Sequence, residues 1–396
     1  MRFLWAGVLC FFIGQAMAGQ GISPYTYEKL TRIQALLGEG KLPQAAGDLD
    51  DLLKDVANAP LAMALTLQTY AQLEMQRNQL PAAQQRLQQA LKIDNLDEAT
   101  RNQLRVQSAQ IYFSQGDYAA LIQSLQPWLQ TLPTDAPATA FALLGAGFYA
   151  QEKFAPGLPF IEEAIKRSGE IKEPWLLLAF AGCFQTRQYD RALYYSDILL
   201  SHFPDKKDYW LQKSGMLQLQ NKLSEAAAVR YAASNQGFAF SDAEVVSYAQ
   251  LLGVSGAPLK TGQVLNQLGQ QKTLDEKERR LLLQAWLQAR EREKARAVLQ
   301  SLFDDFARIE DGVWLLQMQV DAELWSAVLP LAGQLLDKKL DNKQHGLILI
   351  YQGIALYRLN KTDAALESMQ AASRYNEVKS QADAWRQYML QMRQQN

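Results

Sequence analysis

A helical pattern of about 34 residues recurs ten times along the chain, and this repetition limits the possible folds more than any other feature. One copy reads GDYAALIQSLQPWL from Gly116, with apolar residues at every third or fourth position. Such a helix is amphipathic and must bury its apolar stripe against a neighbour. The ten copies start at Gly40, Asn78, Gly116, Glu152, Arg187, Asn221, Gly256, Arg290, Glu323 and Asn360. This period predicts a solenoid of stacked helix pairs.

Each unit also carries small or apolar residues at fixed places. The residue five positions after the start is small or compact, and alanine fills six of the ten occurrences. The residue twelve positions after the start is always apolar and is Trp128 in the third unit. The fifth and sixth units fit least well, because Ser196 and Arg230 fall on core positions. We therefore expect these two repeats to be slipped in register or irregular.

The segment LLGAGFYAQEKFAPG at 143–157 resembles the tetratricopeptide repeat (TPR) family in its Leu-Gly, aromatic and turn spacing. The resemblance covers residues 19–378 and implies an all-α, right-handed superhelix of about ten antiparallel helix pairs. The remaining residues, 379–396, read as one more helix with Ala382, Trp385 and Met389 on its buried side. We expect this helix to cap the stacking face of the last repeat.

The N-terminus MRFLWAGVLCFFIGQAMA has one basic residue, an apolar run of 11 residues and a small-residue site. This pattern predicts a signal peptide over residues 1–18, cleaved after Ala18, and a periplasmic protein. The run is too short to span a bilayer of about 30 Å, although an uncleaved membrane anchor stays an alternative. We expect no transmembrane segment in the mature chain. Cleavage would leave Cys183 as the one cysteine, and hence no internal disulfide.

Charge and motifs argue against nucleic acid and against catalysis. The formal net charge is −1 and no Lys/Arg block dominates, so nucleic acid is a poor partner. His202 and His345 have no second histidine or cysteine at the spacing of metal ligands. Phosphate-binding loops and the hydrolase elbow are missing, and Cys183 falls on an apolar core line. We expect no enzyme, no catalytic residue, no cofactor and no metal site.

Two periodic lines of side chains are expected on the concave side of the solenoid. Six positions before each start, glutamine fills six of the ten places, and three positions before it apolar and aromatic residues predominate. Carboxamides can pair with the backbone of an extended peptide, and aromatic residues can anchor its side chains. The candidate groove residues are Gln72, Met75, Gln110, Phe113, Tyr149, Phe184, Gln250, Gln284 and Gln317. The same pattern is typical of packing between neighbouring helices, so both interpretations stay open.

Three segments resemble exported repeat proteins associated with TonB energy-transduction systems: ISPYTYEKLTRIQALLGEGK after the signal peptide, YAQLLGVSGAPLKTGQVL at 248–265 and YQGIALYRLNKTDAALESMQAA at 351–372. This resemblance implies an accessory of iron–siderophore or haem uptake that binds envelope proteins, such as a TonB-family protein or an outer-membrane receptor. An adaptor for outer-membrane assembly or cell-wall machinery is the main alternative. An enzyme with an unrecognised site and a small-ligand chaperone are the others.

Overall fold

The computed structural model describes residues 21–395, and within them it contains 21 helices and no strand. The expected all-α class is therefore confirmed. The predicted signal peptide, residues 1–18, lies outside the described residues.

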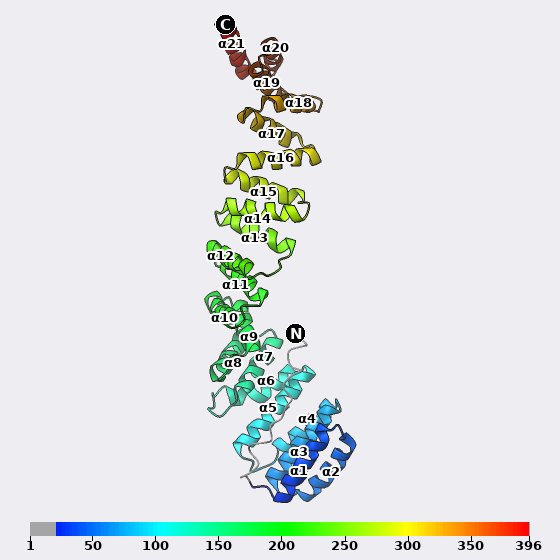
Figure 1. The fold of residues 1–396 in the computed structure, drawn as a ribbon. Helices are drawn as coiled ribbons and strands as arrows, with labels where there is room; N and C mark the ends of the chain where they lie inside the picture. The colour runs from blue at the N-terminus through cyan, green and yellow to red at the C-terminus, as the bar shows by residue number, and fades with distance from the viewer. Residues whose placement is uncertain (1–20, 396) are drawn as a thin grey trace. The chain divides into compact units, whose positions relative to one another are not determined.

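Ten helix pairs and a last single helix follow one another in chain order (Figure 1). Neighbouring helices pack together from α1 to α10 in unit 1 and from α12 to α21 in unit 2, and a turn of two or three residues joins the two helices of each pair. The pairs are α1 (Pro24–Gly38) with α2 (Leu42–Asp55), α3 (Pro60–Gln76) with α4 (Leu80–Leu91), α5 (Glu98–Gln115) with α6 (Tyr118–Leu129), α7 (Ala138–Ala150) with α8 (Phe154–Arg167), α9 (Glu173–Gln185) with α10 (Tyr189–His202), α11 (Lys207–Leu219) with α12 (Leu223–Asn235), α13 (Asp242–Val254) with α14 (Pro258–Gln271), α15 (Glu276–Gln288) with α16 (Arg292–Phe306), α17 (Ile309–Asp321) with α18 (Trp325–Leu336), and α19 (Asn342–Arg358) with α20 (Thr362–Ala372). The last helix is α21 (Lys379–Gln395).

All ten repeat starts adopt the left-handed backbone conformation, with φ between 55° and 82°. In the fifth turn, for example, the Arg187 N–H donates to the Phe184 carbonyl at 3.0 Å and the Gln188 N–H donates to the Cys183 carbonyl at 2.8 Å. The same two bonds close each of the ten turns and form the Schellman motif that ends many helices. The repeat register derived from the sequence is therefore correct in every unit.

This turn geometry predicts opposite effects for two substitutions. Arg187→Gly is expected to raise the free energy of unfolding by about 0.5–1 kcal/mol, because glycine adopts a positive φ without the strain of a Cβ atom. Gly116→Ala is expected to lower it by about 1 kcal/mol, and no neighbour would touch the added methyl group. Urea unfolding followed by circular dichroism measures both. A less stable Arg187→Gly variant would contradict the first expectation.

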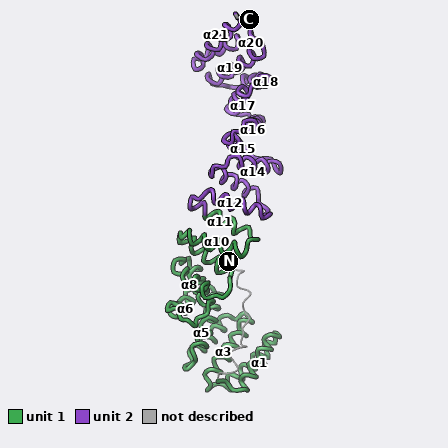
Figure 2. The backbone as a smooth tube through the Cα atoms, turned by 60° about the vertical axis from the view of Figure 1, so that its left-hand side comes forward, with its two compact units in different colours: residues 1–216 green, residues 217–396 purple. Residues whose placement is uncertain are grey.

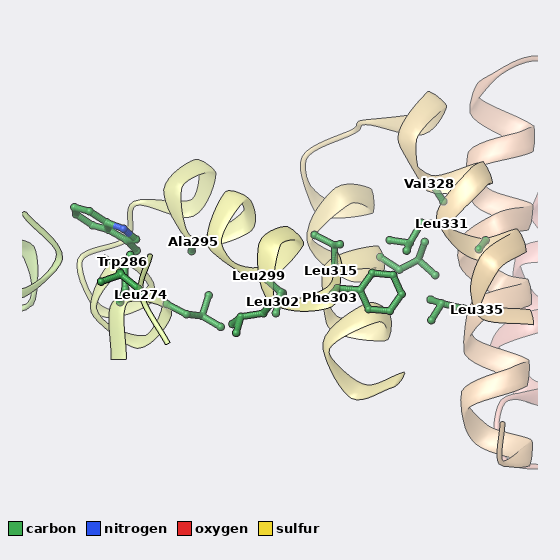
Figure 3. Packing of buried hydrophobic residues seen from close by; sticks show 14 of the residues in the cluster. Leu274, Trp286, Ala295, Leu299, Leu302, Phe303, Leu315, Val328, Leu331 and Leu335 are labelled. Atoms are coloured by element: carbon green, nitrogen blue, oxygen red, sulfur yellow. The ribbon is translucent and has the colours of Figure 1, made fainter. Parts of the chain in front are cut away.

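The chain divides into two compact units, unit 1 up to Met216 and unit 2 from Leu217 onward (Figure 2). Helix α11 contains the boundary. In unit 2, a continuous hydrophobic core runs through α13 to α19, and Figure 3 shows its middle part, with Leu299, Phe303 and Leu315 among its members. A second core in this unit joins α19, α20 and α21, and it buries Ala382 and Met389 with Trp385 packed beside them.

The position nine residues after each repeat start is buried in all ten units. It is apolar in eight of them: Leu49, Leu87, Leu125, Ile161, Leu265, Leu299, Ala332 and Met369. The two exceptions are Ser196, which is fully buried, and Arg230, which is 9% exposed. The expectation of slipped repeats in the fifth and sixth units is therefore wrong. Their turns keep the common register, and two polar residues lie on ordinary core positions.

One expected core residue is displaced by a neighbour. Trp128 is only half-buried, and the adjacent Leu129 is fully buried in its place. Leu129 continues the four-residue spacing of Leu121 and Leu125, which puts all three on one face of α6. The Arg105 guanidinium lies over the Trp128 ring, 5.8 Å from its centroid.

Between residues 21 and 395, no helix is both long enough and apolar enough to cross a membrane.

Candidate functional site

The candidate groove residues of unit 1 are mostly half-buried between helices. Gln72, Met75, Gln110, Phe113 and Tyr149 all have this intermediate exposure, whereas Phe184 is 40% exposed. The Gln34 amide donates to the Gln72 side-chain oxygen at 3.2 Å, from α1 to α3. Two successive glutamines of this line therefore bond to each other across the repeats.

Two of the aromatic residues also pack inside their own repeat. Phe113 meets Tyr118 edge to face at 5.3 Å between ring centroids, and Tyr149 meets Phe154 at 5.1 Å. Both pairs join the same two repeat positions, one on each side of the turn. The Tyr149 ring also lies against Gly157 and Gly182, and burial raises the pKa of its hydroxyl. In these two repeats Phe113 and Tyr149 therefore stabilise the packing of the helix pair.

The three candidate glutamines of unit 2 are exposed. Gln250, Gln284 and Gln317 occupy one repeat position on α13, α15 and α17, the first helices of three successive pairs. Their carboxamides can donate and accept hydrogen bonds to a bound chain. The exposed part of the glutamine line is therefore in unit 2.

Cys183 has the environment of a structural thiol. It is fully buried in α9 among Ala179, Ala192 and Leu199, and burial raises its pKa to about 11. A thiol with a raised pKa is a poor nucleophile at neutral pH. Over residues 21–395, the structure also brings together no group of three or more His, Cys, Asp or Glu side chains that could hold a metal ion.

A cavity of about 440 Å³ lies in unit 2 between α12, α13 and α14. We call it the Arg230 pocket. Its lining combines a buried cation, aromatic and branched apolar side chains, and a row of carboxamides. These residues are Arg230, Tyr231, Ser234, Phe240, Glu244, Val245, Tyr248, Leu252, Lys260, Gln263, Val264, Gln267, Leu268 and Gln271. Its volume falls within the range of small-molecule sites, about 300–1,000 Å³.

Arg230 is buried with little compensation for its charge. Its Nη2 donates to the Glu244 backbone carbonyl at 3.2 Å, while its buried Nε has no hydrogen-bond partner among the described residues. Burial lowers the pKa of the guanidinium, and the nearby Glu244 carboxylate opposes that shift. Arginine nevertheless stays protonated at neutral pH, so the pocket contains a permanent positive charge.

The other charged groups of the pocket are engaged locally. The Glu244 carboxylate accepts from the Ser241 backbone N–H at 2.7 Å and from the Ser241 hydroxyl at 3.0 Å, which completes the capping box of α13. Lys260 on α14 places its ammonium 5.3 Å from the centroid of the Tyr231 ring. The Glu244 carboxylate is thus held at the N-terminus of α13, and the Lys260 ammonium is a second cation at the pocket.

No family profile and no curated protein matches the sequence. Among solved structures, a tetratricopeptide repeat protein from Parabacteroides merdae is 14% identical with a TM-score of 0.40, covering 66% of this chain and 99% of that one. PilF from Pseudomonas aeruginosa is 16% identical with a TM-score of 0.40, covering 53% and 91%. The C-terminal part of a TPR repeat-containing protein from Cytophaga hutchinsonii is 13% identical with a TM-score of 0.41, covering 69% and 94%. The helix pairs and turns described above establish an α-solenoid fold. The similarity to these solved structures is too low to add to that conclusion.

The structure separates the predicted groove from the Arg230 pocket. Each residue turns an α-helix by about 100°, so Gln250 lies about half a turn around α13 from the pocket residue Tyr248. None of the nine candidate groove residues lines the pocket. The charged residue Arg230 on a core position is a signal for this pocket in the sequence, but from the repeat pattern alone it indicates an irregular repeat.

Proposed function

We propose that this protein is a periplasmic scaffold that binds an extended segment of an envelope protein along its first helices. The observation that carries this proposal is the row of Gln250, Gln284 and Gln317, exposed at one position of three successive repeats. A solenoid offers such a row as a continuous binding surface. The half-buried aromatic residues of unit 1 are additional candidates for anchors.

The expected partner belongs to a TonB-type transport system. The three segments that resemble TonB-associated repeat proteins are the support for this partner. Export rests on the signal-peptide pattern of residues 1–18. Protein sequencing of the mature protein from a periplasmic extract is expected to begin at Gly19, and a first residue of Met1 would favour the uncleaved anchor.

Crosslinking in cells tests the partner. A photo-crosslinking residue at Gln284 is expected to capture a TonB-family protein or its outer-membrane receptor, mainly in iron-starved cells. The same residue at Gln381, exposed on α21, is the control and is expected to capture much less. Capture of wall or outer-membrane assembly proteins, independent of iron, would replace the TonB assignment by the alternative adaptor.

Substitution of the glutamine row tests the surface itself. The triple change of Gln250, Gln284 and Gln317 to alanine is expected to weaken binding of the captured partner by about tenfold or more, since several hydrogen bonds are lost together. The matched control changes three exposed glutamines away from this row, Gln370, Gln381 and Gln391. Equal affinity of both variants for the partner would show that the row does not bind it.

A further inference from the structure

We propose that the Arg230 pocket of unit 2 binds the carboxylate group of a ligand whose remaining part is aromatic or branched and apolar. The ligand is either a free organic acid or the C-terminal residue of a polypeptide, because both present the same chemistry. This site is separate from the glutamine row and does not depend on the proposed scaffold function.

The first argument is the state of Arg230. A guanidinium has five N–H donors, and a buried charge is costly unless its donors are satisfied. Within residues 21–395, its one hydrogen bond to the protein goes to the Glu244 carbonyl, and Nε has none. Eight of the ten repeats place an apolar residue at this position, so the fold itself does not require a cation here. A carboxylate in the cavity would supply acceptors and a compensating charge together.

The second argument is the wall of the pocket. Val245, Leu252, Val264 and Leu268 provide apolar surface, and the rings of Phe240 and Tyr248 extend it. Such a lining with a few placed polar groups is typical of ligand sites. The carboxamides of Gln263, Gln267 and Gln271, spaced by four residues on α14, can bond polar atoms next to the carboxylate.

The charge balance favours a carboxylate over a phosphate. The pocket offers the buried Arg230 and the exposed Lys260, with the Glu244 carboxylate close enough to act on Arg230. These three groups carry a net charge of about +1, so a ligand with one negative charge would balance it. A dianion would meet stronger repulsion from the Glu244 carboxylate than a monoanion does, and among residues 21–395 the only cations in the pocket lining are Arg230 and Lys260.

Isothermal titration calorimetry of the mature protein tests the proposal. The probes are 4-phenylbutyrate, indole-3-acetate and N-acetyl-phenylalanine, each paired with its neutral amide. At least one acid is expected to bind with 1:1 stoichiometry and about 10–100-fold more tightly than its amide. A peptide ending in phenylalanine, with a free or an amidated C-terminus, distinguishes a chain end from a free acid. Phenyl phosphate is included as the dianion.

Arg230→Leu is the decisive variant, and it is expected to reduce binding of the acid to the level of the amide. Arg292→Leu removes an exposed arginine on α16 that does not line the pocket, and it is expected to leave the affinity unchanged. The proposal is overturned if no acid binds more tightly than its amide, or if Arg230→Leu binds like the unchanged protein. Stronger binding of phenyl phosphate would also overturn the choice of a carboxylate. None of these probes involves the glutamine row, so the outcome is independent of the scaffold experiments.

Discussion

Arg230→Leu is expected to raise the free energy of unfolding by about 1–3 kcal/mol, because a poorly compensated buried charge is replaced by an apolar side chain. Leucine is also the residue that five other repeats place at this position, where it is fully buried, as at Leu49 and Leu299. The substitution does not leave the Glu244 carbonyl without a hydrogen bond, because this carbonyl lies inside α13 and accepts from a backbone N–H of the same helix. Urea unfolding followed by circular dichroism measures the change.

The matched control for charge is Arg292→Leu, which is expected to change stability by less than about 0.5 kcal/mol. A gain in stability together with a loss of carboxylate binding would mark Arg230 as a residue kept for function at the expense of the fold. A stability loss in Arg230→Leu would instead mean that the guanidinium supports the repeat, and the argument from its missing partners would fail.

Gly182→Ala is expected to lower the free energy of unfolding by about 2–3 kcal/mol. A Cβ atom on Gly182 would lie 1.8 Å from the Tyr149 hydroxyl oxygen and 3.1 Å from Leu158 Cδ1. Tyr149 has little room to move away, because its ring already lies against Gly157 and its hydroxyl is buried. The strain must therefore spread into α7 and α8.

A second substitution separates this clash from a general defect. Tyr149→Phe removes the atom that comes closest, so the double variant Gly182→Ala/Tyr149→Phe is expected to recover about 1 kcal/mol of the loss. The buried hydroxyl has no hydrogen-bond partner among the described residues, and Tyr149→Phe alone should cost little. Gly47→Ala is the control, since an added methyl group on this exposed glycine of α2 touches nothing and should stabilise the helix by about 0.5–1 kcal/mol. A Gly182→Ala variant as stable as the unchanged protein would contradict the packing around Tyr149.

The repeat register could be predicted because many positions agree at once. Glycine and asparagine at six of the ten starts favour a left-handed turn by their own chemistry. Glu152, Arg187, Arg290 and Glu323 adopt the same conformation against their local preference. At those four places the stacking of the neighbouring helices decides the backbone, and only the alignment of the repeats reveals it.

The Arg230 pocket could not be derived from the sequence, although its central residue was conspicuous there. A charged residue on a core line is compatible with an irregular repeat, an ion pair or a cavity. Which one occurs depends on how the neighbouring side chains fill space. In α12, Ala226, Ala227 and Ala233 supply little volume on the buried side. The repeat pattern also could not predict which glutamines are exposed, because Gln72 accepts a hydrogen bond from Gln34 whereas Gln284 faces solvent.

The buried thiol of Cys183 can be used to measure local unfolding of this protein. It is the one cysteine among residues 21–395, and a thiol reagent can reach it only when the packing around α9 breaks. Solenoids unfold in segments because each repeat contacts mainly its neighbours. The rate of thiol modification at increasing urea therefore measures the opening of this part of unit 1. Circular dichroism of the same sample follows the helices of both units, so the two signals distinguish stepwise from concerted unfolding without any engineered label.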